Sequence, residues 1–234
     1  MRLAFITIGQ SPRNDVLNEI LPKLQVYDVM VVERGVLDDV DEKTIEMVIP
    51  ESKEDTLITR LRSGASVKLS RKKILPRLIR LVEELEKKAD IVVLLCTDEF
   101  PELRSSRLIK PFELMAREVI RRKPKSLGVV IPLPEQERKA RDKWGKVAKN
   151  IEIVPFPPYS SLDIMTKDRL EKLGRTQLVV MDCIGYSFRH KKILIEIAET
   201  SIILPREILA RELERIISTG NREHKSDLSI ICPF

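Results

Sequence analysis

Short apolar runs alternate along the chain with longer segments in which apolar residues recur every three or four positions. Runs such as 3–8 and 91–95 are continuous and end near Gly, Ser or Cys, which predicts strands buried on both faces. In segment 71–88 the apolar residues have helical spacing, with charged residues between them. Strands that alternate with helices predict parallel sheets built from right-handed βαβ units.

The same pattern gives the order of elements. The expected strands are 3–8, 27–33, 91–95, 127–131, 151–154, 178–181 and 201–204, and a β-hairpin is expected from 56–62 and 66–70. The expected helices run from Pro12 to Leu24, over 71–88, from Pro101 to about Arg122 and over 134–149. Three more are expected: one that ends at Gly174, one that begins at about Arg189, and one from Pro205 to about Ser218.

The order of elements starts again near residue 124, and two strands end in very similar sequences. In the sequence IVVLLCTDEF the apolar strand ends at Cys96, and in LVVMDCIGYS it ends at Cys183. The fold class predicted is therefore α/β with two similar lobes, each a mostly parallel sheet flanked by helices. Residues 1–123 form the first lobe, 124–220 the second, and 221–234 a tail without periodicity, with a cleft between the lobes.

Composition narrows the class of protein. Hydrophobic residues make up 43% of the chain and aromatic residues 4%, which suits a core of Val, Ile and Leu. No apolar run approaches the roughly 20 residues that span a bilayer. The N-terminal run resembles a first strand more than a signal peptide, so we expect a cytoplasmic protein without membrane contact.

The net charge of the chain gives little information about its binding partners. Lys and Arg number 42 against 36 Asp and Glu, a net charge of +6, but most basic residues sit beside Glu on helical faces. We therefore expect no nucleic-acid partner. Many Lys, Arg and Glu with only four Asn and four Gln is a composition typical of thermophiles. Three cysteines without a C-x-x-C pair predict neither a disulfide framework nor a metal site.

The two strand-end cysteines are the candidate chemistry. Ligands of parallel sheets bind where strands end and helix N-termini converge, and a nearby helix N-terminus lowers the pKa of a thiol. A thiolate on one face of a carbon and a thiol on the other form a base and acid pair. The competing interpretation is that Cys96 and Cys183 are only small packing residues, because Cys is among the most buried types.

Three segments carry a family resemblance. T-I-G-Q-S-P-R at 7–13, E-D-T-L-I-T-R-L at 54–61 and M-D-C-I-G-Y at 181–186 together resemble the AroM family, which is similar in turn to the Asp/Glu/hydantoin racemase superfamily. The likeness extends over about residues 1–218. It implies two α/β lobes around an active site with one cysteine from each, acting on a carbon next to a carboxylate without metal or other cofactor. Superfamily members include amino-acid racemases, hydantoin racemase, maleate isomerase and arylmalonate decarboxylase.

The resemblance assigns roles to individual positions. Cys96 and Cys183 match the two catalytic thiols. The positions implied to hold the substrate carboxylate, through a side chain or a backbone N–H, are Gln10, Ser11, Arg13, Thr97, Asp182, Ile184 and Gly185. Asp182 could equally cap the next helix, and Arg13 could be solvated. Gln10-Ser11 replaces the usual Asp-Ser start, and no Thr-His follows Cys183, which weakens the case for amino-acid racemisation.

Other candidates have a plain structural alternative. Arg60 and Lys68 could contact an anion or be solvated, and His190 could be a general acid or a surface residue. The loop 157–161, with Tyr159 and Ser161, could close over a ligand or be a stiff connector. Asp98 and Glu99 suit a loop, and the tail residues His224 and Cys232 receive no role.

The sequence thus leads to two hypotheses. The first is a cofactor-independent racemase, isomerase or lyase that acts on a small carboxylate substrate through the cysteine pair. The second is a binding or regulatory protein for a small anionic metabolite that kept the cleft without the chemistry. A homodimer is the default expectation for its assembly.

Overall fold

The computed structural model describes residues 1–25, 27–159 and 164–219 of the chain. The tail expected at 221–234, including His224 and Cys232, therefore lies outside the described residues, as does Ser161. Within the described part, no helix combines the length and apolarity needed to cross a bilayer.

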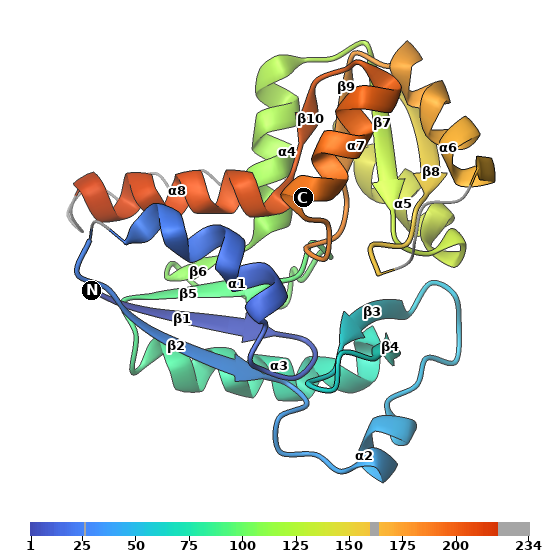
Figure 1. Ribbon diagram of the computed structural model, residues 1–234. Coiled ribbons are helices and arrows are strands. Elements are labelled where there is room, and N and C mark those ends of the chain that lie inside the picture. The colour runs from blue at the N-terminus through green and yellow to red at the C-terminus, as the bar shows by residue number, and fades with distance from the viewer. Residues whose placement is uncertain (26, 160–163, 220–234) are drawn as a thin grey trace.

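Two four-stranded parallel sheets form the centres of the two lobes (Figure 1). The first has the order β2-β1-β5-β6, with bounds Met30–Gly35, Arg2–Thr7, Ile91–Leu95 and Leu108–Ile109. The second has the order β10-β9-β7-β8, with bounds Ile202–Ile203, Leu178–Met181, Ser126–Ile131 and Asn150–Pro155. Each lobe begins with a central strand, places its second strand on one edge and later adds two strands on the other side. The predicted α/β fold of two similar lobes is confirmed.

Helices cover both sheets. Their bounds are α1 Asn14–Ile20, α2 Glu42–Met47, α3 Arg71–Glu86, α4 Pro111–Arg122, α5 Glu137–Trp144, α6 Ile164–Glu171, α7 Phe188–Ala198 and α8 Pro205–Thr219. Short 3₁₀ turns lie at Leu21–Leu24, Pro134–Gln136 and Lys172–Arg175. The central strands β1, β5, β7 and β9 are almost wholly buried, as their continuous apolar runs predict.

Three predicted helices are shorter than expected. The helix expected from Pro12 to Leu24 begins at Asn14 and ends at Ile20, where a 3₁₀ turn continues it. The helix expected from Pro101 begins at Pro111, because Leu108 and Ile109 instead pair with β5 as the edge strand β6. The proline then starts α4, where its missing N–H costs nothing. The helix expected over 134–149 opens with a 3₁₀ turn and ends at Trp144.

The last helix of each half packs on the sheet of the other half (Figure 1). Helix α4 follows β6 of the first lobe, but Phe112, Met115 and Val119 join the core of β7 and β9. Helix α8 follows β10 of the second lobe, but Leu209 and Leu213 join the core of β1, β5 and α1. In space, therefore, the two lobes share an exchanged helix pair across the boundary expected at residues 123 and 124.

A sequence repeat marks this exchange. Residues 111–118 read Pro-Phe-Glu-Leu-Met-Ala-Arg-Glu and residues 205–212 read Pro-Arg-Glu-Ile-Leu-Ala-Arg-Glu. In both helices the proline stands at the start, and the alanine is buried where the helix meets the sheet of the other half. Two equivalent helices with equivalent buried faces indicate that the halves are related by an internal repeat.

A β-hairpin of β3 (Thr56–Arg60) and β4 (Ser66–Ser70) is inserted in the first lobe (Figure 1). It docks on the turn after β1: Gln10 N–H donates to Arg60 O at 3.4 Å, and Arg62 N–H donates to Gln10 Oε1 at 2.9 Å. Arg62 Nε also donates to Ser11 O at 2.7 Å. A Cβ at Gly9 would overlap Arg60 O and the Thr59 hydroxyl, so glycine is needed for this close approach.

We predict that Gly9→Ala destabilises the fold by about 1–3 kcal/mol, because the new methyl group must push the hairpin backbone away. Urea denaturation followed by circular dichroism measures the loss. Ser66→Ala, an exposed change on the same hairpin, should stay within about 0.5 kcal/mol of the parent. Equal stability of the two variants would contradict the tight docking.

Candidate active site

A cavity of about 50 Å³ lies where the carboxyl ends of the two sheets face each other. The first lobe lines it with Arg13 and residues 95–98, the hairpin with residues 57–59, and the second lobe with residues from β7, α5 and the end of β9. An ordinary small-molecule site has roughly 300–1,000 Å³. The space between the lobes is therefore narrow and holds only a few water molecules, so a larger ligand needs the lobes to move apart.

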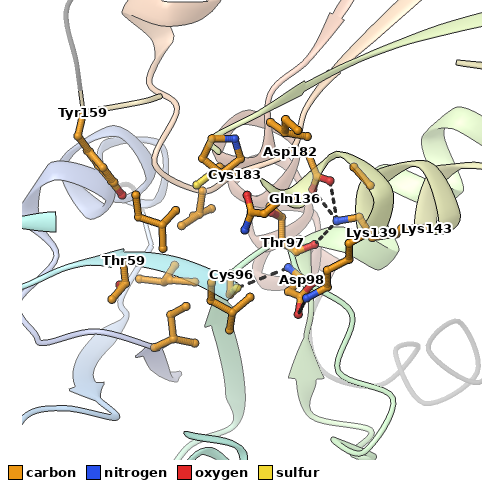
Figure 2. Close-up of a pocket in the computed structure, with 18 of the residues that line it drawn as sticks. Thr59, Cys96, Thr97, Asp98, Gln136, Lys139, Lys143, Tyr159, Asp182 and Cys183 are labelled. Atoms are coloured by element: carbon orange, nitrogen blue, oxygen red, sulfur yellow. Dashed lines mark hydrogen bonds and ion pairs between the residues drawn. The ribbon is translucent and has the colours of Figure 1, made fainter. Parts of the chain in front are cut away.

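Both cysteines line this cavity, one from each lobe (Figure 2). Cys96 directly follows β5 and Cys183 stands two residues after β9. Each sulfur accepts a backbone N–H from two residues further on: Asp98 N–H to Cys96 Sγ at 3.5 Å, and Gly185 N–H to Cys183 Sγ at 3.4 Å. The equivalent strand ends of the two halves thus present their thiols in the same local geometry.

The thiols are neutral in the closed cavity, contrary to the lowered pKa expected from the sequence. Burial raises the pKa of Cys96 to about 12, and the charge of Asp98 adds to the effect. Burial also raises the pKa of Cys183, but only to about 11, because the Gly185 N–H and the charges of Arg13 and Arg206 oppose it. Desolvation outweighs the backbone N–H groups at both strand ends.

A buried ion pair joins the two strand ends. Lys143 Nζ, on α5, donates to Asp182 Oδ1 at 2.7 Å and to Thr97 O at 3.0 Å. Trp144 Nε1 donates to Asp182 Oδ2 at 2.7 Å, so both carboxylate oxygens are engaged. Burial alone would lower the pKa of Lys143, but the charges of Asp182, Asp98 and Glu99 and the hydrogen bond to Asp182 together outweigh burial and raise the pKa. Lys143 therefore fixes the residue after Cys96 relative to the residue before Cys183 (Figure 2).

Another ion pair, from Lys139 to Asp98, crosses from the second lobe to the first. Lys139 Nζ donates to Asp98 Oδ2 at 2.8 Å, and Arg71 Nε lies 3.3 Å from the same oxygen. Asp98 is buried, whereas the Lys139 side chain is 22% exposed. The carboxylate of Asp98 is thereby balanced by two cations beside Cys96.

Tyr159 closes the cavity next to Cys183. Arg13 Nη2 donates to the Tyr159 hydroxyl at 3.2 Å, while its Nε donates to Asp15 at 2.8 Å. A Cβ at Gly185 would lie only 2.5 Å from the Tyr159 hydroxyl, so Gly185 provides the room for the ring. Burial raises the pKa of Tyr159 to about 12, which keeps the hydroxyl protonated.

Arg206 holds the segment that follows Cys183. It is buried at the start of α8, and Nε and Nη2 donate to Ile184 O and Gly185 O, each at 2.8 Å. Nη1 donates to Asp15 O at 2.6 Å. The exchanged helix therefore fixes the orientation of the Gly185 N–H that reaches the Cys183 sulfur.

The structure brings together most, but not all, of the residues singled out in the sequence. Those that line the cavity are Cys96, Cys183, Arg13, Thr97, Asp182, Ile184, Asp98 and Tyr159. Gln10 and Ser11 lie outside it, since Gln10 binds the hairpin and Leu37 O, and the Ser11 hydroxyl donates to Asp38 at 2.7 Å. Gly185 contributes its N–H to the sulfur and space to Tyr159.

The remaining candidates have structural partners. The Arg60 guanidinium lies 5.2 Å from the centre of the Tyr159 ring, and Lys68 pairs with Glu135 on the second lobe. Glu99 pairs with Lys146 at 2.8 Å. The His190 imidazole receives the Ser187 N–H at 3.0 Å in a capping box at the start of α7 and does not line the cavity.

Sequence reasoning missed four polar residues of the lining: Thr59, Gln136, Lys139 and Lys143. Thr59 stands within a segment that carries the family resemblance, which was a usable signal. Lys139 and Lys143 are one helical turn apart and face the cavity together. Six of the eight residues of α5 are charged, however, so the sequence offered no reason to select these two.

Comparisons with known proteins agree with this architecture. The model of the AroM family ("AroM protein") matches residues 3–217. Allantoin racemase from Klebsiella pneumoniae superimposes with a TM-score of 0.58 at 11% identity, covering 97% of this chain and 93% of the other. A search of the curated proteins found no match.

Two further solved structures have the same fold. Glutamate racemase from Francisella tularensis gives a TM-score of 0.55 at 11% identity, covering 93% of this chain and 81% of the other. Maleate isomerase from Pseudomonas putida gives a TM-score of 0.54 at 10% identity, covering 91% of each chain. At these identities the likeness establishes the fold.

We predict that Lys143→Met destabilises the protein by about 3–5 kcal/mol at neutral pH, because Asp182 is left buried without its cation. The double variant Lys143→Met/Asp182→Asn should recover part of this loss. Lys139→Met is the matched control, since Asp98 keeps Arg71, and its loss should be clearly smaller. Urea denaturation of the parent and these three variants measures the coupling, and equal losses for Lys143→Met and Lys139→Met would contradict it.

Proposed function

Because this chain belongs to the AroM family and has the fold of the racemases compared above, we propose that it is a cofactor-independent racemase, isomerase or lyase. Its substrate is a small carboxylate, and Cys96 and Cys183 are its acid and base. The observation that carries the proposal is that two thiols from equivalent strand ends of opposite lobes line one cavity.

The surroundings of the two sulfurs divide the roles. Burial raises the pKa of both thiols, but the Gly185 N–H, Arg13 and Arg206 offset burial at Cys183 more than the Asp98 N–H and Lys139 do at Cys96, although Asp182 lies beside Cys183 and Asp98 beside Cys96. Cys183 is therefore the thiol that ionises first. Its thiolate removes a proton from the carbon next to the substrate carboxylate, and the Cys96 thiol returns a proton to that carbon from the other side or to a neighbouring carbon.

The charged lining supports binding of an anion. Lys139 and Lys143 on α5 and Arg13 after β1 place three cations around the cavity, against the carboxylates of Asp98 and Asp182. Electrostatic stabilisation of a carboxylate that gains enolate character needs donors fixed before the reaction, and these side chains are already held by hydrogen bonds.

One observation favours the second hypothesis, a binding or regulatory protein for a small anionic metabolite. Both thiols have raised pKa values, and reactive cysteines usually have lowered ones. In that case the cavity would bind a carboxylate and leave its carbon–hydrogen bonds intact.

Hydrogen exchange separates the two hypotheses. A panel of small carboxylates incubated with the protein in D₂O should include one whose hydrogen next to the carboxylate is replaced by deuterium, detected by ¹H NMR. We expect Cys183→Ala and Cys96→Ala each to slow this exchange at least about 100-fold, the scale of general acid–base catalysis. Cys232→Ala, a change at the third cysteine, should leave the rate unchanged. Full exchange by Cys183→Ala would exclude the mechanism.

The pH dependence follows from the raised pKa of Cys183. Since its thiolate is the active base and its pKa is about 11, only a small fraction is ionised at neutral pH. We expect kcat/KM to rise with pH by about tenfold per unit between pH 7 and pH 10 without a plateau. A series of initial rates in buffers of constant ionic strength measures the slope. A plateau already reached at pH 7 would show that the base is another group.

A further inference from the structure

The charged groups of the cavity lining are already matched with one another. Asp182 accepts from Lys143 and Trp144, and Asp98 pairs with Lys139 and Arg71. Both carboxylates in the described lining therefore have their cations, and both are buried. A ligand ammonium group entering this space would find no carboxylate without a partner, and an unpaired buried charge is costly.

The rest of the lining is largely apolar. The hairpin contributes Leu57 and Ile58, the strand ends contribute Leu95 and Ile131, and the segment after Cys183 contributes Ile184. These side chains come from both lobes. Apolar surface around the reacting space favours a ligand that brings an apolar group of its own.

Lys139 keeps hydrogen-bonding capacity for a ligand in the lining. Its ammonium group has three N–H donors, of which one reaches Asp98. Because Arg71 also pairs with Asp98, a ligand carboxylate can bind Lys139 without leaving Asp98 unpaired. The buried Thr59 hydroxyl packs against Gly9 and has no hydrogen-bond partner among the described residues.

We propose that the ligand of this cavity is a small carboxylate that carries an apolar side group and no ammonium group on the adjacent carbon. Its carboxylate binds Lys139, and its side group lies among the apolar residues of the hairpin and strand ends. This inference deepens the proposed function, on which it rests, by excluding ordinary α-amino acids as substrates.

Matched pairs of acids that differ only in the amino group test the proposal. We would use propionate and alanine, 3-methylbutanoate and valine, and phenylacetate and phenylglycine. The measurement is protection of Cys96 and Cys183 from N-ethylmaleimide at pH 9, followed by peptide mass spectrometry. In at least one pair, we expect the acid without the amino group to protect at a concentration at least about tenfold lower than the matching amino acid requires. The reason is that the amino acid carries an unpaired ammonium charge into the cavity.

The outcomes distinguish this inference from the proposed function. Equal or stronger protection by the amino acids overturns the inference, and so does the absence of protection by every acid tested. If the acids without an amino group protect but none undergoes deuterium exchange, the ligand class stands and the catalytic proposal fails. If amino acids undergo exchange and the other acids do not, the catalytic proposal stands and the ligand class fails.

Discussion

The geometry of the site depends on the hydrogen bonds that the ammonium group of Lys143 donates. It binds the carboxylate of Asp182, next to Cys183, and the carbonyl of Thr97, next to Cys96. One buried charge thus connects the strand ends of two separate sheets. A buried ion pair contributes little net stability. It fixes geometry strongly, however, because the loss of either partner leaves the other charge buried and unpaired. The positions of the two sulfurs relative to each other follow from this constraint and from Arg206, which holds the segment after Cys183.

The two halves of the chain have the same architecture, but their two thiols lie in different surroundings. The sheets share one strand order, each half sends its last helix to the other sheet, and each sulfur accepts the N–H two residues ahead. The differences come from what is not repeated. Among the described residues, the hairpin β3–β4 belongs to the first half alone, and a helix between the last two strands, α7, to the second alone. Cys96 consequently lies beside Asp98 and Lys139, whereas Cys183 lies beside Asp182, Arg13 and Arg206.

The segments that carry the family resemblance have roles beyond contact with a substrate. Gly9 and Gln10 of segment 7–13 bind the hairpin, whose strand β3 belongs to segment 54–61. The two segments therefore pack against each other at the edge of the cavity. The family resemblance implied that Gln10 and Ser11 hold the ligand, whereas their hydrogen bonds hold the hairpin and the β2–α2 connection in place.

The sequence by itself determined the α/β class, the positions of the buried strands and the placement of both cysteines at strand ends. These features depend on local apolar runs and helical spacing, which are present in the chain before it folds. Only the tertiary structure decided that Lys139 and Lys143 serve the cavity, that Thr59 lines it without a partner among the described residues, and that α4 and α8 exchange sheets. It also decided the direction of the thiol pKa values, because desolvation depends on every group packed around the sulfur, and those groups come from distant parts of the chain.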